Sequence, residues 1–419
     1  MTIIFKNNKP FVEGVCLNDL TTTIETPFYI YSQKSIIDAY NNIKKSLNTE
    51  IFFSIKANSN QEILSLMKLL GAGADVVSAG ELERALCAGI EPNKIIFEGV
   101  GKSKNELKYA IKKKIRQINI ESMEELILIE NLGKSLECKV NVGLRLNPDV
   151  DGQTLDKIST GRKTDKFGII FDLLPDICSQ LKTLKHLNLI GISCHIGSQI
   201  NDLNVYKKVF YKMKQASETF ENNNIKIDYL DLGGGFSVNS NNEKEIDFNK
   251  LSILIQKIFS DTKYKISFEP GRYLVSNAGI LVTKILTSKS NGLVNYLITD
   301  AGMQTLLRPA LYNAFHKIVP LQQNNNIKKY TIAGPICESS DILAKNIEIS
   351  EQKTGNYLAV CDTGAYGFVM ASNYNTKSLP AEILIYNDRY AIIRNQEKIS
   401  TLIEKDIIPN WLQRLFRIW

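Results

Sequence analysis

Between residues 33 and 272, short strand-like runs alternate with segments of helical period, and this rhythm constrains the fold more than any other feature of the chain. The expected strands are eight in number and lie at residues 51–55, 75–78, 94–97, 117–120, 139–146, 189–195, 229–232 and 265–269. Segment 205–220 is typical of the helices between them, with an apolar stripe on one face. Eight strands alternating with helices are what a closed barrel of the (β/α)₈ type requires. We therefore expect an α/β chain built around a TIM-like (β/α)₈ barrel.

The remainder of the chain lacks this rhythm. After residue 275, strand-like runs follow one another at 294–299, 327–332, 357–360 and 383–393, the last with a turn at Asn387 and Asp388. The first 32 residues, with an expected strand at 28–31, also show no helical period. A length of 419 residues suits two domains. We predict that 33–274 forms the barrel, and that 1–32 joins 275–419 in a mostly β domain resembling a sandwich or small barrel.

The bulk composition favours a globular protein of a reducing compartment. Hydrophobic residues make up 44% and charged residues 23% of the chain, which argues against disorder. The net charge of +7 is spread along the chain and not gathered on one basic face, so no nucleic-acid partner is expected. The seven cysteines include no CxxC pair, and an odd number cannot close a disulfide framework. With no signal-peptide core and no apolar run of membrane-spanning length, we expect a cytoplasmic protein without a membrane partner.

Lys56 is the first residue that indicates a chemistry. It lies at the end of the first expected strand, within FFSIKANS. The carboxyl ends of barrel strands form the active-site face, so its amine would point into the barrel mouth. Partial burial there would lower the pKa of the lysine, which carbonyl chemistry needs because only the neutral amine attacks. A solvated lysine at a strand end is the alternative, and Lys56 alone leaves it open.

The last two expected strands end in residues suited to a phosphorylated pyridine. Gly233, Gly234 and Gly235 follow the seventh strand in LDLGGGF, and Glu269 ends the eighth in FEPGRY. Adjacent glycines let backbone N–H groups surround a phosphate, which barrels commonly bind at these two strands. A carboxylate such as Glu269 can hold a proton on a pyridine nitrogen. The alternatives are a flexible turn and a salt bridge from Glu269 to Arg272.

The sixth expected strand ends in CHIGSQ, at the same end of the barrel. His195 could stack on an aromatic cofactor there, and Ser198 could bind its phosphate. A single histidine on a strand is more often a core residue, but its position beside Lys56 and Glu269 favours a functional role. Together, the strand ends predict a site for pyridoxal 5'-phosphate (PLP) bound through Lys56.

Ten motifs, in order along the chain, resemble the fold-type III PLP-dependent decarboxylases. They are FFSIKANS, GADVVSAGEL, NIES, ISTGRKTDKFGI, CHIGSQ, LDLGGGF, EPGRY, DAGMQTLLRPALYNAFH, GPICESSD and GAYGFVMASNYN. The resemblance covers nearly the whole chain and is strongest to members that act on meso-2,6-diaminopimelate. It implies removal of carbon dioxide from this substrate to give L-lysine, the last step of lysine biosynthesis. Two stretches depart from the family pattern, TKSLPAE after ASNYN and TLDKIST near Thr154, and they leave the shape of loops open.

The resemblance also implies roles for single residues. The implied catalytic residues are Lys56, which links to the cofactor, His195, which stacks on its ring, and Cys337, which protonates the carbanion. The implied cofactor-binding residues are Lys56, Asp75, His195, Ser198, Gly234, Gly235, Glu269, Pro270, Gly271, Arg272 and Tyr366. The implied substrate-binding residues are Arg272, Arg308, Tyr312, Glu338 and Tyr366. Because the matching cysteine of the family comes from the partner subunit, a homodimer with shared active sites is implied, and no metal.

Three alternatives stay open. A decarboxylase of the same fold acting on ornithine or arginine would need acid at the far end of its pocket, whereas Arg308 and Tyr312 suit a second substrate carboxylate. A PLP-carrying regulatory protein without turnover should have lost Lys56 or Cys337, and both are present. A barrel enzyme without PLP should show no absorption from a lysine–cofactor link.

Overall fold

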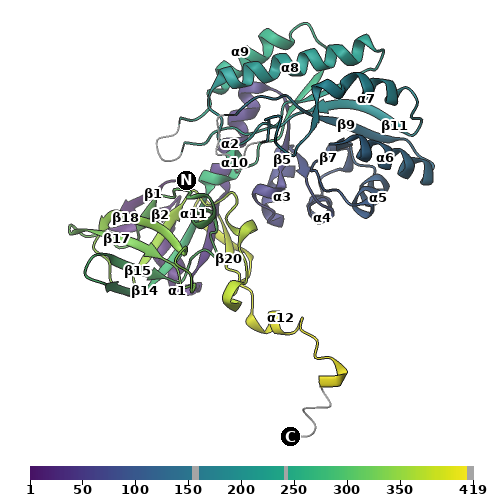
Figure 1. Cartoon of the computed structure of the whole chain (residues 1–419). Helices are drawn as coiled ribbons and strands as arrows, with labels where there is room; N and C mark the ends of the chain where they lie inside the picture. Colours follow the sequence, from purple (N-terminus) through teal and green to yellow (C-terminus); the bar gives the residue numbers. More distant parts are fainter. Residues whose placement is uncertain (153–159, 240–243, 413–419) are drawn as a thin grey trace. The chain divides into compact units, whose positions relative to one another are not determined.

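The computed structural model describes residues 1–152, 160–239 and 244–412 and divides into two compact units (Figure 1). The unit called here the barrel unit comprises Gln33–Ala278 and Gly364–Val369. The β unit comprises Met1–Ser32, Gly279–Thr363 and Met370–Trp419. The predicted domain limits at residues 32 and 274 stay a prediction. Most of the divergent TLDKIST stretch lies outside the described residues.

The barrel unit contains a closed ring of parallel strands. They are β5 (Glu50–Ser54), β6 (Gly73–Val76), β7 (Ile95–Phe97), β8 (Gln117–Ile120), β9 (Val140–Asn147), β11 (Leu187–Ser193), β12 (Tyr229–Asp231) and β13 (Lys265–Phe268). Neighbours in this order pair in parallel, and β13 pairs with β5 to close the ring. The short β10 (Ile169–Ile170) adds to β9. Each strand overlaps its expected range, and the predicted (β/α)₈ barrel is confirmed.

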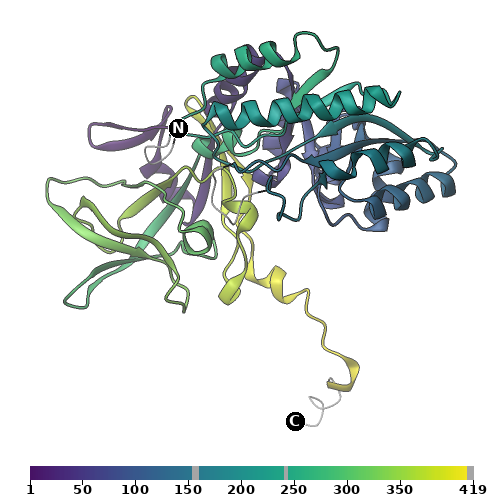
Figure 2. The ribbon, with the colours of Figure 1, turned by 45° about the horizontal axis from the view of Figure 1, so that its top comes forward.

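Helices lie around the strands of the barrel unit (Figure 1; Figure 2). They are α2 (Gln33–Leu47), α3 (Gln61–Leu70), α4 (Ala79–Cys87), α5 (Lys104–Lys113), α6 (Met123–Ser135), α7 (Leu174–Leu181), α8 (Leu203–Asn222), α9 (Phe248–Phe259) and α10 (Arg272–Val275). Serine side chains fix where three of them begin, since Ser78, Ser103 and Ser122 each accept the backbone N–H three residues on. The expected apolar face of α8 is buried, including Val209, Phe210 and Met213.

The β unit holds the other large sheet. Its strands are β4 (Phe28–Ser32), β14 (Gly279–Ser290), β15 (Asn295–Thr299), β16 (Ile318–Pro320), β17 (Ile327–Ala333), β18 (Ile342–Ser350), β19 (Tyr357–Cys361), β20 (Ala381–Tyr386) and β21 (Arg389–Arg394). The N-terminal β4 pairs with both β14 and β20, and its Phe28 and Ile30 join Ile280, Val282 and Ile383 in one apolar core. The prediction that the N-terminal segment joins a mostly β domain is confirmed. A small sheet of β1 (Ile3–Lys6), β2 (Lys9–Val12) and β3 (Val15–Cys16) accompanies it.

Short helices in the β unit escaped the sequence analysis. The first 32 residues, expected to contain none, form α1 (Leu17–Thr23), and the later part contains α11 (Arg308–Tyr312) and α12 (Ile399–Ile403). In α1 only Leu17 and Leu20 are buried, so too few positions repeat for a helical period to show in the sequence. Across the described part of the chain, no helix combines the length and the apolar character needed to cross a membrane.

Candidate active site

A cavity opens at the carboxyl ends of the barrel strands. The predicted site residues that line it are Lys56, His195, Ser198, Gly235, Glu269, Pro270, Gly271, Arg272 and Tyr366. All of them belong to the barrel unit, although they come from widely separated segments. The structure therefore brings nine of the eleven predicted cofactor residues together around one space, and the other two, Asp75 and Gly234, do not line it.

Lys56 is held by an acid from the neighbouring strand. It lies in the single turn η1 (Ile55–Ala57) directly after β5, and its Nζ donates to Oδ2 of Asp75 at 3.1 Å. Burial favours a lower pKa for Lys56, but the charge of Asp75, then that of Glu269, and the hydrogen bond to Asp75 raise this pKa above its usual value. The expectation of a lowered lysine pKa is therefore wrong, because the nearby negative charges outweigh desolvation. In this arrangement Lys56 is an ammonium ion that must release a proton before it attacks a carbonyl.

The turn after β12, residues 233–235, is called here the glycine turn, and it has no room for side chains at Gly234 and Gly235. A Cβ on Gly234 would lie 2.3 Å from the carbonyl oxygen of Glu269, and one on Gly235 would lie 2.5 Å from that of Gly197. Gly235 also has a φ of +80°, which side chains disfavour. A buried acid anchors the start of the turn, since Oδ1 of Asp231 accepts the N–H of Gly233 at 2.8 Å. Such a bare backbone can approach a phosphate closely.

His195 lies half-buried beside this turn. Its Nδ1 accepts the N–H of Gly234 at 3.3 Å. Burial, and then the positive charges of Lys56 and Arg145, lower the pKa of His195 well below its usual value. The imidazole is thus neutral near pH 7, so it can stack on an aromatic ring without adding a positive charge.

Glu269 presents an oxygen without a partner. The residue is 4% exposed, and its Oε1 makes no hydrogen bond to any of the described residues. Burial, and then the charges of Asp231 and Asp75, raise the pKa of Glu269 well above its usual value. A buried acid of this kind is stabilised by a cationic N–H donor, and a protonated pyridine nitrogen is one.

Tyr366 comes from a distant part of the sequence but belongs to the barrel unit. Its backbone N–H donates to the carbonyl oxygen of Ala57 at 2.8 Å. The guanidinium carbon of Arg272 lies 4.8 Å from the Tyr366 ring centroid, and Nε of Arg272 donates to Oγ of Ser198 at 3.0 Å. A phosphate could thus meet a guanidinium and a hydroxyl that are already held together.

The residues around the cavity fit PLP. The cofactor needs an amine for its aldehyde, donors for its phosphate, an acid for its ring nitrogen and a flat group for its ring face. The amine is that of Lys56, the phosphate donors are in the glycine turn, the acid is Glu269 and the flat group is His195. The unpartnered oxygen of Glu269 is the most specific match.

Apart from Arg272 and Tyr366, which belong to the barrel unit, the predicted substrate and dimer residues form two groups in the β unit. Arg308 begins α11, and its guanidinium carbon lies 5.8 Å from the ring centroid of Tyr312. Cys337 and Glu338 are neighbours on an exposed loop, where Glu338 accepts a hydrogen bond from the hydroxyl of Tyr374. That hydrogen bond is the main reason why the pKa of Glu338 lies below its usual value. Glu338 is therefore a carboxylate that could receive an ammonium group.

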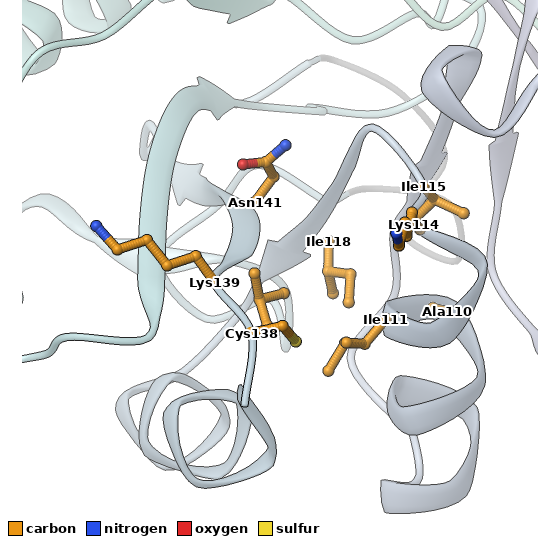
Figure 3. A pocket seen from close by; sticks show the side chains of 9 residues that line it. Ala110, Ile111, Lys114, Ile115, Ile118, Cys138, Lys139 and Asn141 are labelled. Carbon is orange, nitrogen blue, oxygen red and sulfur yellow. The ribbon is translucent and has the colours of Figure 1, made fainter. Parts of the chain in front are cut away.

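A larger cavity lies between α5, β8 and β9 (Figure 3). Its walls are mainly apolar, with Ile111 and Ile118 inside and Lys114 and Lys139 among its lining residues. The residues that border it lie just before β8 and β9 or at their starts. The cavity is therefore at the end of the barrel opposite Lys56. None of the predicted site residues lines it, so size alone does not identify the active site.

Sequence reasoning missed two residues near Lys56. The hydroxyl of Ser54 donates to Oδ2 of Asp75 at 2.7 Å. Glu81, in α4, has a pKa of about 7, raised mainly by burial. Both lie in motifs quoted above, Ser54 two positions before Lys56 in FFSIKANS and Glu81 in GADVVSAGEL, and these motifs were the available signal.

Comparison with known proteins agrees with this geometry. The family model described as "Pyridoxal-dependent decarboxylase, pyridoxal binding domain" matches residues 33–276. The diaminopimelate decarboxylase of Aquifex aeolicus is 38% identical over 406 residues, which cover 96% of this chain and 97% of the relative. The diaminopimelate decarboxylase of Helicobacter pylori, solved in complex with L-lysine, has a TM-score of 0.90 and 36% identity, covering 93% of this chain and 98% of that one. The enzyme of M. jannaschii, also in complex with L-lysine, has a TM-score of 0.91 and 33% identity, covering 97% and 98%. The chain therefore belongs to the pyridoxal-dependent decarboxylase family.

Proposed function

We propose that this chain is a diaminopimelate decarboxylase, which uses PLP to convert meso-2,6-diaminopimelate to L-lysine and carbon dioxide in the last step of lysine biosynthesis. The observation that carries the proposal is the cavity that joins Lys56 to the unpartnered oxygen of Glu269. The relatives named above support the choice of substrate, since two of them were solved with L-lysine, the product of this reaction.

The barrel residues would hold the cofactor in one orientation. Lys56 would bind its aldehyde carbon, Ser198 and the glycine turn would bind its phosphate, and His195 would cover a ring face. Glu269 would keep a proton on the ring nitrogen. When bound, PLP supplies a conjugated ring that accepts the electron pair left behind as carbon dioxide departs.

Two protons have to move on the protein's own groups. Lys56 must release one from Nζ, and Oδ2 of Asp75 is the nearest acceptor at 3.1 Å. After carbon dioxide has left, the substrate carbon needs a proton, and we assign this step to the thiol of Cys337. Its exposure supports the assignment, because a partner subunit could use it.

The β unit would recognise the second amino-acid head of the substrate. Arg308 offers a planar pair of donors that matches a carboxylate, and Tyr312 beside it can add a hydroxyl. Glu338 would receive the ammonium group, and Arg272 and Tyr366 of the barrel unit are the other residues that we assign to substrate binding. Ornithine and arginine lack a second carboxylate, and this difference disfavours them as substrates.

The proposal includes a homodimer in which each active site takes Cys337 from the partner. A reducing compartment such as the cytoplasm suits it, because all seven cysteines are free thiols and one of them is needed as a proton donor. Neither a nucleic acid nor a membrane has a part in the reaction.

The direct test is incubation of the purified protein with PLP and meso-diaminopimelate, with lysine and carbon dioxide measured by mass spectrometry. Lys56→Ala should abolish the visible absorbance of the bound cofactor and reduce turnover about a thousandfold or more. Lys139→Ala, which changes a lysine at the opposite end of the barrel, serves as the control and should behave as the wild type. Failure to form lysine, or equally fast turnover of ornithine, would refute the proposal.

A further inference from the structure

Ser54 joins the ends of three barrel strands. It is the last residue of β5, its side chain is buried, and its backbone N–H donates to the carbonyl oxygen of Pro270 at 3.3 Å. Its hydroxyl oxygen lies 2.7 Å from Oδ2 of Asp75 on β6 and 3.0 Å from the carbonyl oxygen of Glu269 after β13. A hydroxyl has one proton, and the charged, nearer oxygen of Asp75 is the better acceptor.

The oxygen that Ser54 contacts is the one that holds Lys56. Oδ2 of Asp75 accepts hydrogen bonds from Nζ of Lys56, at 3.1 Å, and from the hydroxyl of Ser54. The other carboxylate oxygen, Oδ1, is buried and has no hydrogen-bond partner among the described residues. Ammonium and hydroxyl therefore compete for the charge of a single oxygen. A second donor on a carboxylate oxygen weakens its hold on the first.

We propose that Ser54 is a positioning residue that makes Lys56 release its proton more readily. Its hydroxyl keeps the Asp75 carboxylate in place and takes up part of the charge that would otherwise stabilise the lysine ammonium. The neutral amine becomes more abundant, and carbonyl attack requires that form. This inference rests on the proposed function, in which Lys56 is the amine that binds PLP.

Loss of the hydroxyl gives a defined expectation. In Ser54→Ala, Lys56 is the remaining side-chain donor to Oδ2 of Asp75 among the residues that the structure describes, so the ammonium is held more strongly. A hydrogen bond of ordinary net strength corresponds to about half to one pKa unit. The fraction of neutral amine, and with it the rate of PLP capture, should fall about three- to tenfold.

The experiment uses two pairs of variants. Ser54→Ala is compared with the wild type, and Ser54→Val with Ser54→Thr, which has nearly the same shape but keeps a hydroxyl. Ser267→Ala is the matched control, because Ser267 is a buried barrel serine whose hydroxyl donates at 2.6 Å to another buried acid, Asp231. Thermal unfolding followed by circular dichroism verifies that each variant is folded.

Two measurements decide the outcome. Stopped-flow absorbance gives the rate at which apoprotein captures PLP at pH 7, and a pH titration gives the midpoint at which the bound lysine–cofactor link loses its proton. We expect Ser54→Ala and Ser54→Val to capture PLP about three- to tenfold more slowly than Ser54→Thr and the wild type. Their titration midpoint should lie about half to one unit higher. Ser267→Ala should match the wild type in both.

Equal capture rates for Ser54→Ala and the wild type would overturn the proposal. If the titration midpoint lies outside the accessible pH range, the capture rate alone decides the outcome. The same slowing in Ser267→Ala would also overturn it, because any lost buried hydroxyl would then have this effect. Absence of a lysine–cofactor link in the wild type would instead refute the proposed function, and the role of Ser54 with it.

Discussion

Asp231 shows how a single buried acid makes the barrel sensitive to pH. Its Oδ1 accepts the N–H of Gly233, and its Oδ2 accepts the hydroxyl of Ser267 at 2.6 Å. Both hydrogen bonds favour the carboxylate, but burial outweighs them and raises the pKa of Asp231 to about 7. The protonated form of Asp231 therefore fits the folded barrel better than the carboxylate does.

The first prediction concerns the pH dependence of folding in Asp231→Asn. The folded pKa, about 7, exceeds the usual value, so the residue favours folding at low pH and this contribution is lost as pH rises toward 7. Asparagine cannot ionise. The melting temperature of Asp231→Asn relative to the wild type should therefore increase between pH 5 and pH 8, by about 2 °C or more.

Differential scanning fluorimetry without added cofactor measures this difference. Asp247→Asn is the control, because Asp247 is an exposed helix cap whose pKa lies below its usual value, so it stays ionised over the same range. Parallel curves of melting temperature against pH for Asp231→Asn and the wild type would contradict the prediction.

At the scale of elements, the sequence predicted what depends on local pattern. Runs such as 51–55 are mainly apolar, short and followed by a helical stripe, so the strands of the barrel could be placed from periodicity alone. The segment Gly364–Val369 could not be assigned to the barrel in this way, because no local pattern in the sequence marks it. It belongs there through long-range contacts, such as the hydrogen bond from Nδ2 of Asn58 to the carbonyl oxygen of Gly364.

The same limit applies to the site. Lys56, the glycine turn and Glu269 follow from their positions at strand ends, and they meet around one cavity as predicted. The raised pKa of Lys56 depends on how near Asp75 and Glu269 lie in space, and the sequence contains no such distance. Ser54 was visible in its motif but gained a role only through its distance to Asp75.

The second prediction concerns the turn after β12. In Gly235→Ala, the added methyl group would meet the carbonyl oxygen of Gly197 and the residue would keep a strained positive φ. We expect a destabilisation of about 2 kcal/mol and PLP binding at least about tenfold weaker, because the backbone that would face the phosphate has to shift.

Gly101→Ala is the matched control for this variant, since an added Cβ there meets nothing within 4 Å. Chemical denaturation and fluorescence titration with PLP measure the two effects. A Gly235→Ala variant with the affinity of the wild type would show that the turn does not carry the phosphate.

At the scale of the whole molecule, the chemical groups are divided between the two units. The barrel unit has the amine of Lys56 and the carboxyl group of Glu269, whereas the β unit has the guanidinium of Arg308 and the thiol of Cys337. The proposed reaction needs both sets.

The third prediction is that two inactive variants restore activity when mixed. If each site combines Lys56 of one subunit with Cys337 of its partner, a hybrid of Lys56→Ala and Cys337→Ala has one site with both defects and one intact site. Random pairing makes half of the dimers hybrids, so about a quarter of the wild-type activity should return. Lys56→Ala mixed with Glu269→Gln is the control, because both residues lie in the barrel unit of one chain and no hybrid site would be intact. With subunit exchange verified by native mass spectrometry, no recovery in the first mixture, or equal recovery in both, would exclude the shared site.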